Sequence, residues 1–297
     1  MSGSSLRPGK QIEPVAARPF SLPSTASSWG GIRPLFLFLL RTEVHVYAFA
    51  VAANVLISFF PFLVAMILLC RWGFHWQAGV DVIIQTVTNY FPEGFGVDFK
   101  SYLLAYHRFS WISVFLLLFT ANGIFVPLEV ALNRIWRVKQ NRNFLRNQVV
   151  SLGLIFACGA LVLASVSATT LNVRFLSAQF GSTHTGVLLQ GIGFRVFALL
   201  ATVLMILLIY WILPNAKIPI KRLIPASVAV AVLLEVSKYL NILTWPWLRS
   251  KLRADVPPFV QSISIILWAF VATLIILAGA EWSARASEDS LDEEPRP

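Results

Sequence analysis

The 297-residue chain has few charged side chains, few cysteines and few histidines, and each shortage excludes a class of protein. Charged residues make up 13% of the sequence, too few to cover the surface of a soluble protein. Cys70 and Cys158 lie beside or within apolar runs, which favours small buried apolar residues over a disulfide. The four histidines are scattered and none has ligand spacing to Cys, Asp or Glu, so no zinc site is predicted.

The sequence also has no phosphate-binding loop and no GxSxG nucleophile turn. We therefore predict that the chain is not an enzyme and that it needs no cofactor. Its net charge of +10 would suit a nucleic-acid-binding protein, but most basic residues fall between apolar runs. That placement favours contact with lipid head groups, and no nucleic-acid partner is predicted.

Hydrophobic residues are abundant instead, at 57% of the chain with a mean hydropathy of +0.72. About 20 apolar residues are needed to cross a hydrocarbon core of about 30 Å as a helix. Six runs meet this requirement, at residues 46–70, 111–132, 149–171, 194–213, 223–243 and 263–282. The sequence therefore predicts an all-α, polytopic membrane domain with six transmembrane helices over residues 33–285.

The segments outside these runs have different compositions. Residues 1–32 are rich in Ser, Pro, Gly and Arg, which predicts a disordered cytoplasmic tail. Residues 33–45 mix apolar and charged side chains, as expected of an N-terminal interfacial helix. The first outer loop, 71–110, predicts a short amphipathic helix ending near Tyr90 and a second one over 97–106. Residues 286–297 form an acidic tail.

The distribution of Lys and Arg predicts the orientation in a bacterial inner membrane. With both termini in the cytoplasm, fifteen basic residues lie inside and seven outside, in agreement with the positive-inside rule. A basic cluster formed by Arg249, Lys251 and Arg253 runs against this bias. Contact with outer-leaflet head groups and contact with a periplasmic partner are both open interpretations of that cluster.

Two ionisable residues, Glu235 and Lys238, lie inside the fifth predicted span. Their spacing of three places them on one helix face within reach of each other. A charge near the bilayer centre is costly, and such residues often mark a pathway for substrates or ions. The pair either lines a polar, hydrated interior together with Asn54 and Asn122, or forms a structural ion pair that locks two helices together.

Glu129 lies about two turns before the predicted cytoplasmic end of the second span. It either joins the same polar cavity or lies at head-group level and pairs with Arg134 or a nearby basic loop residue. Glu281, at the end of the last span, is predicted to be either a surface acid or a partner for the inner basic loop. The turn containing Pro214 and Asn215 is expected to end one helix and orient the next.

Several stretches of the sequence resemble the YihY/BrkB family of bacterial inner-membrane proteins: NVLISFFPFLVAMILL, EVALNRIWRV, YWILPNAKIPIKRLIPAS, LLEVSKYL and LWAFVATLIILAGAEWSA. The resemblance covers about residues 35–285 and implies six helices and a role in envelope integrity. It also implies that the ribonuclease BN label once given to the family is mistaken. The residues that match the family motifs are Pro61, Asn133, Pro214, Asn215, Glu235, Lys238, Gly279 and Glu281.

These expectations combine into one functional hypothesis. The chain acts in envelope biogenesis and handles or transports a lipid or an anionic envelope intermediate through a polar intramembrane cavity lined by Glu129, Glu235, Lys238, Asn54 and Asn122. Its expected partners are membrane lipids and periplasmic or envelope-assembly proteins. An alternative is a scaffold for envelope machinery that transports nothing, and ribonuclease activity is the least favoured interpretation.

Overall fold

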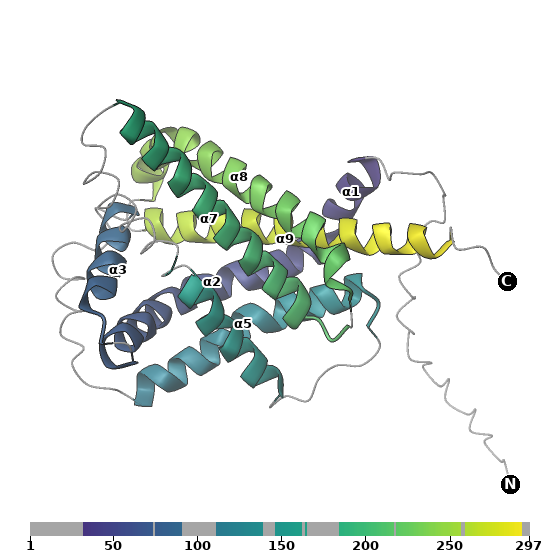
Figure 1. Cartoon of the computed structure of the whole chain (residues 1–297), viewed down its shortest axis with the longest axis horizontal. Helices are drawn as coiled ribbons and strands as arrows, with labels where there is room; N and C mark the ends of the chain where they lie inside the picture. The colour runs from purple at the N-terminus through teal and green to yellow at the C-terminus, as the bar shows by residue number, and fades with distance from the viewer. Residues whose placement is uncertain are drawn as a thin grey trace, which may run out of the picture. The chain divides into compact units, whose positions relative to one another are not determined.

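A computed structural model describes residues 32–73, 75–90, 111–138, 146–161, 164, 184–216, 218–256 and 259–292. All regular structure among these residues is helical (Figure 1). The helices are α1 (Ile32–Leu39), α2 (Thr42–Leu68), α3 (Gln77–Tyr90), α5 (Trp111–Ile135), α7 (His184–Ile212), α8 (Ile220–Asp255) and α9 (Val260–Asp292), with a π-helical turn, η1 (Leu69–Gly73), after α2. A further helix covers Arg146–Leu161.

In the part of the chain that the structure describes, four helices contain stretches long and apolar enough to cross a membrane, namely α2, α7, α8 and α9. The chain is therefore a helical, multi-pass membrane protein, and the total of six spans stays a prediction. Helix α5 occupies the second predicted span, and the Arg146–Leu161 helix occupies the first part of the third. The helix predicted at 97–106, the tail at 1–31 and the end of the third span lie outside the described residues.

The predicted interfacial helix at 33–45 is divided in two. Helix α1 ends at Leu39, and Arg41 adopts an extended conformation with ψ of 131° just before α2 begins at Thr42. Glu43 in the first turn of α2 is favourable for the helix dipole, because the N-terminus of a helix carries a partial positive charge. Residues 42–45 thus belong to the first long helix rather than to the interfacial one.

The last two long helices extend well beyond the predicted boundaries. Helix α8 continues past residue 243 and through Pro246 to Asp255, so that the outer basic cluster lies on a helix and not in a loop. At about 1.5 Å per residue, its 36 residues measure about 54 Å, more than a hydrocarbon core of about 30 Å requires. Helix α9 likewise continues to Asp292, so the first part of the predicted acidic tail is helical.

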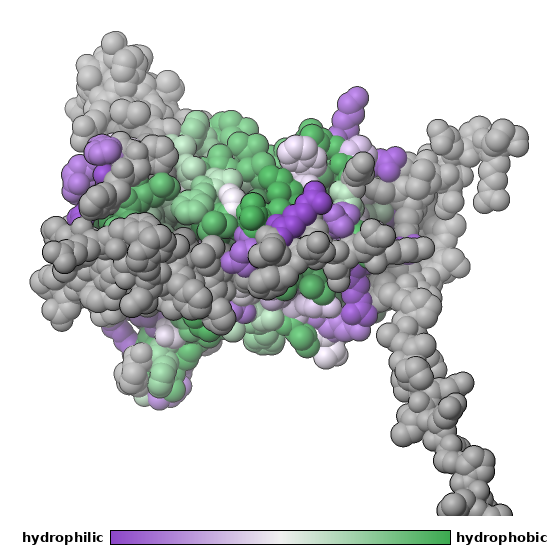
Figure 2. Space-filling view, turned by 90° about the horizontal axis from the view of Figure 1, so that it is seen from below, coloured by the Kyte–Doolittle hydropathy of each residue, from purple (hydrophilic) through white to green (hydrophobic). Residues whose placement is uncertain are grey.

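Helix α9 packs against both halves of the helical domain: α2 and α5 pack along each other, α7 and α8 pack along each other, and α9 contacts α2, α8 and, less extensively, α5 (Figure 1). The main core contains fully buried residues of several of these helices, including Leu132, Tyr210, Leu223 and Leu277. Exposed hydrophobic side chains lie between hydrophilic patches in Figure 2, as expected of a surface that meets lipid.

Candidate functional site

Glu235 and Lys238 form a salt bridge on α8, with the Lys238 Nζ 2.6 Å from Oε1 of Glu235. The side chains are 26% and 37% exposed, respectively. The residues of α8 that are fully buried all lie earlier in the helix, between Leu223 and Ala231. The pair therefore lies on a part of α8 that the rest of the described protein leaves largely uncovered.

The pair retains unused hydrogen-bonding capacity. A lysine ammonium carries three donors, and a carboxylate can accept several hydrogen bonds. Within the described part of the chain, the contacts of Lys238 are its bond to Glu235 and the ring of Tyr239, whose centroid is 5.6 Å from Nζ. The ammonium can thus still donate to an anionic oxygen, and the carboxylate can still accept from a hydroxyl or amine.

The surroundings of the pair are apolar. Exposed neighbours on the same stretch of α8 include Leu233, Val236, Tyr239 and Leu240. Glu235 lies twelve residues, or about 18 Å along the helix, beyond Leu223. If the hydrocarbon core begins at Leu223, as the sequence predicts, an upright α8 puts Glu235 roughly at the middle of that core. An ion pair at this depth needs further hydrogen-bonding partners, because lipid chains offer none.

Both partners of the pair lie on one helix. Among the described residues this salt bridge reaches no second helix, so the alternative that it locks two helices together stays a prediction.

Two other residues of the predicted cavity lie on α2 and α5: Asn54 is at the α2–α5 interface, and Glu129 is buried on α5. Asn54 Nδ2 donates to the carbonyl of Ala50, 2.7 Å away, and its side chain lies against Gly123 of α5. Asn122, the neighbour of Gly123, is on the same stretch of α5. Glu129 is 4% exposed on the same helix.

The predicted cavity residues thus fall on two different helix pairs. Asn54, Asn122 and Glu129 belong to α2 and α5, whereas Glu235 and Lys238 belong to α8, which packs chiefly on α7 and α9. The structure brings Glu235 and Lys238 into contact, whereas the first group shares a helix pair without a contact among its three members in the described residues. Helix α9 packs on both α2 and α8 and so contacts both pairs.

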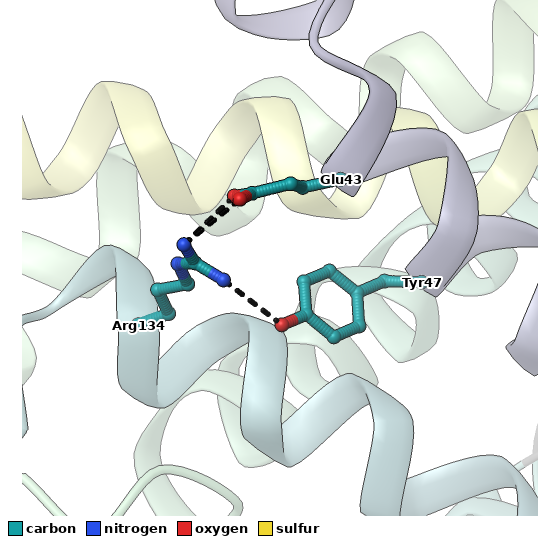
Figure 3. Close-up of polar contacts among 3 residues, drawn as sticks. All are labelled: Glu43, Tyr47 and Arg134. Carbon is teal, nitrogen blue, oxygen red and sulfur yellow. Dashed lines mark hydrogen bonds and ion pairs between the residues drawn. The ribbon is translucent and has the colours of Figure 1, made fainter. Parts of the chain in front are cut away.

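A second polar arrangement links the beginning of α2 to the end of α5 (Figure 3). The Arg134 guanidinium lies 2.9 Å from Oε2 of Glu43 and donates to the Tyr47 hydroxyl over 3.4 Å. The side chains of Arg134 and Glu43 are 43% and 52% exposed, so water can screen their attraction. Sequence reasoning missed Glu43 and Tyr47, although their spacing of four places both on one face of a helix.

The C-terminal end of α5 is fixed by backbone hydrogen bonds and by one side-chain hydrogen bond. Its last turn closes with bonds from Val138 N to Asn133 O (2.8 Å) and from Arg137 N to Arg134 O (3.2 Å), with Arg137 at a φ of 53°. These are the two bonds of a Schellman motif. The buried Asn133 side chain then accepts a hydrogen bond from the backbone N–H of Asn215, 2.8 Å away.

This bond ties the end of α5 to the turn between α7 and α8, which contains the buried Pro214. The expectation that this turn is architectural agrees with the contact. Pro61 is also buried, within the continuous helix α2.

The end of α9 contains a buried acid. Glu281 is 2% exposed, so the expectation of a surface acid is wrong. Its Oε1 accepts hydrogen bonds from Nε of Arg285 at 2.8 Å and from a terminal guanidinium nitrogen at 2.7 Å. One helical turn further along α9, the Arg285 side chain is 27% exposed. Burial of the carboxylate is thus compensated by a charged partner on its own helix.

Gly279, just before this acid, lies where three helices meet. A Cβ built on Gly279 would overlap the Val230 side chain of α8 and would lie 2.8 Å from the hydroxyl of Tyr210 on α7. Tyr210 is fully buried and donates to the backbone carbonyl of Ile276 over 2.5 Å. The small residue therefore allows the close approach of helices that this junction requires.

Comparison with known proteins places these features in a family context. The family model described as "Virulence factor BrkB" matches residues 36–297. The chain is 29% identical over 223 residues to a UPF0761 membrane protein of Pseudomonas aeruginosa, which covers 70% of this chain and 50% of that protein. It is 30% identical over 185 residues to a UPF0761 membrane protein of Acinetobacter baylyi, covering 58% of this chain and 41% of that one.

The chain thus spans about half the length of the curated relatives it matches. These relatives carry the name of membrane proteins and not that of an enzyme. No solved structure matches the chain.

Proposed function

The chain belongs to the virulence factor BrkB family of membrane proteins, and on this premise we propose that it binds the head group of a membrane lipid, or of an anionic envelope intermediate, at Glu235 and Lys238. The acyl chains of the ligand stay in the bilayer, against the apolar face of α8. We place this activity in the bacterial inner membrane, with both termini in the cytoplasm and a role in envelope biogenesis.

One observation carries the proposal: a partly exposed ion pair in the middle of an otherwise apolar helix surface. If hydrocarbon alone surrounded it, the pair would leave several donors and acceptors unsatisfied, and each would cost about 1–3 kcal/mol. A phosphate oxygen can accept from Lys238, and a head-group hydroxyl or amine can donate to Glu235. The same two contacts that satisfy the protein would select a lipid by its polar end.

Polar residues on α2 and α5 form the second part of the proposed pathway. Asn54, Asn122 and Glu129 lie on the helix pair on the other side of α9. Helix α9 packs on both α2 and α8, which makes it one route for a head group that moves between the two groups. We expect transport along this route, as opposed to binding, to involve a change in how α9 packs.

The test uses the purified full-length chain, freed of lipid, with phosphatidylglycerol, phosphatidylethanolamine and phosphatidylcholine added one at a time. Retained lipid is counted by native mass spectrometry for the wild type and for Lys238→Met and Glu235→Gln. Loss of one charge-assisted hydrogen bond, worth about 1.5–3 kcal/mol, should weaken binding about tenfold or more. A lipid that binds the wild type and Lys238→Met equally well would refute the proposal.

Glu43→Gln is the matched control, because it also removes the acid of a salt bridge but at the end of a helix. It should leave lipid retention unchanged. The scaffold alternative predicts that exchanging Glu235 and Lys238 leaves cellular function intact. We expect this exchange, like Lys238→Met, to reproduce the deletion phenotype in an envelope-stress assay at wild-type expression.

A further inference from the structure

Polar side chains recur at every third position along one part of α8. From the middle of the helix toward its C-terminal end they are Glu235, Lys238, Asn241 and Thr244. Residues three apart are neighbours on a helix surface, and rows of this spacing form ridges along it. The four side chains therefore make one continuous line, here called the polar ridge.

The last two members of the ridge have hydrogen-bonding groups to spare. Asn241 and Thr244 are both exposed. The Thr244 hydroxyl donates to the backbone carbonyl of Leu240, 2.8 Å away, which leaves its oxygen able to accept a hydrogen bond. Within the residues that the structure describes, the Asn241 side chain makes no hydrogen bond, so its amide can both donate and accept. The ridge thus offers polar groups beyond those of the Glu235–Lys238 pair.

The length of the ridge matches the thickness of one leaflet. Thr244 lies nine residues beyond Glu235, or about 14 Å along the helix, and half of a hydrocarbon core of about 30 Å is about 15 Å. If the core begins at Leu223, as the sequence predicts, an upright α8 puts Thr244 at its opposite edge. The ridge therefore runs from the middle of the core to the head groups at the C-terminal end of α8.

The same row of α8 is apolar in the opposite direction. Counting back from Glu235 in steps of three gives Val232, Ala229, Ala226 and Leu223. The last two are fully buried and belong to the main core. A head group that entered from this end would find no hydrogen-bonding side chain on the row and would have to displace packed core residues. The polar ridge therefore connects the pair with one leaflet and not with the other.

We propose that the polar ridge is the route by which a lipid head group reaches the Glu235–Lys238 pair, and that it admits lipid from the leaflet at the C-terminal end of α8, which the sequence predicts to be the outer one. This route rests on the proposed function, because it leads to the pair as the head-group site. The Asn241 amide donates to a phosphate oxygen on the way, and Thr244 accepts from a head-group hydroxyl or amine. Successive members are about 4.5 Å apart along the helix, so a head group can contact one before it leaves the last.

The first test measures the exchange of bound lipid. The purified full-length chain is loaded with phosphatidylglycerol and mixed with an excess of deuterated phosphatidylglycerol, and native mass spectrometry follows the replacement over time. Loss of a hydrogen bond to a charged phosphate during passage should slow exchange in Asn241→Leu about tenfold or more. Retention at equilibrium should match the wild type, because a route affects entry and release alike. Lys238→Met should instead lower retention itself, which separates the route from the site.

Two variants control for other effects of this substitution. Asn241→Gln keeps an amide at the position and should exchange lipid at close to the wild-type rate. Ser237→Val removes a polar side chain from the same stretch of α8 but off the ridge, and it should leave the rate unchanged. If Asn241→Leu exchanged lipid as fast as the wild type, or if Ser237→Val slowed exchange as much, the ridge would not be the route.

The second test determines which leaflet supplies the lipid. The Ser283 hydroxyl of α9 donates to the Arg222 carbonyl at the start of α8, so an affinity tag at the C-terminus marks the end of the bundle opposite to Thr244. Vesicles with at most one protein molecule are sorted by whether the tag is accessible from outside, and deuterated phosphatidylglycerol is then delivered to their outer leaflet. Vesicles with the tag inside should exchange bound lipid faster, by about tenfold or more, because the ridge then faces the supplied leaflet.

The outcomes separate the route from the binding site. Equal exchange in the two vesicle populations, or faster exchange with the tag outside, would overturn the one-sided route while leaving binding at the pair intact. If the wild type retained no phosphatidylglycerol in either test, the proposed function would fail and the route with it.

Discussion

Replacement of Gly279 by alanine is the most direct test of how the helices of this protein pack. The new methyl group would overlap the Val230 side chain and would press on the hydroxyl of Tyr210. Both neighbours are fully buried, so neither can move into solvent or lipid. The Tyr210 hydroxyl is also fixed by its hydrogen bond to the Ile276 carbonyl. We therefore expect Gly279→Ala to separate α9 from α7 and α8.

The expected loss of stability follows from three contributions. Forcing a methyl group into a packed core costs about 1–3 kcal/mol. Weakening the Tyr210 hydrogen bond costs about 1 kcal/mol more. Alanine, however, is favoured over glycine in a helix by about 1 kcal/mol. The sum predicts that Gly279→Ala lowers the free energy of unfolding by about 1–3 kcal/mol.

Gly153→Ala is a matched control, because Gly153 also lies in a helix but a Cβ there would meet nothing within 4 Å. Gly153→Ala should change the free energy of unfolding only through the higher helix propensity of alanine, a gain of up to about 1 kcal/mol. The two variants should thus differ by about 2–4 kcal/mol. Because Trp136 packs edge-on against Tyr210, with ring centroids 5.7 Å apart, tryptophan fluorescence during titration with sodium dodecyl sulfate can follow the unfolding of this junction.

Two results would refute the reasoning. If both glycine variants shifted the unfolding midpoint equally, the close approach of α9 to Val230 would contribute nothing to the free energy of unfolding. If Gly279→Ala were more stable than the wild type, the helices would have room for the methyl group, and the packing described for this junction would be wrong.

Two further predictions concern polar and close contacts elsewhere. Arg285→Met should destabilise the protein by about 3–5 kcal/mol, because it leaves the Glu281 carboxylate buried without its cation. Glu281→Gln should cost less. Unfolding titrations of both variants would show the opposite order if Glu281 were solvated. Gly123→Ala should destabilise by about 1–3 kcal/mol by displacing the Asn54 side chain. Adding Asn54→Ala should recover part of this loss in a double-mutant cycle, and strictly additive effects would contradict the contact.

The helices and the class of protein could be predicted from the sequence because both depend on local hydrophobicity. Each of the six predicted runs coincides, in its described part, with a helix. The contact between Glu235 and Lys238 was also predictable, since helical spacing alone brings them together. The extension of α8 to Asp255 was not predictable. A proline followed by basic residues resembles the end of a span, yet an exposed helix can continue through such a proline, as α8 does at Pro246.

Contacts between distant segments could not be predicted from periodicity. Asn133 and Asn215 are 82 residues apart, and Arg134 and Glu43 are 91 apart. Hydrophobicity predicts the helices that carry or flank these residues but does not determine which helix lies beside which. The burial of Glu281 depends in the same way on the close packing that Gly279 permits, which becomes visible only when α7, α8 and α9 are assembled.

The polar contacts described above fall into two classes: those that join segments or neutralise a buried charge, and the Glu235–Lys238 pair. The Asn133–Asn215 bond and the Arg134–Glu43 pair each connect two segments, and the Glu281–Arg285 pair neutralises an acid in the packed core. Within the described residues the Glu235–Lys238 pair connects no two elements and neutralises nothing in the core, yet it lies near the middle of a helix long and apolar enough to span a membrane. A charge at bilayer depth is costly, and this cost is the reason why we propose a ligand with its own polar groups at the pair.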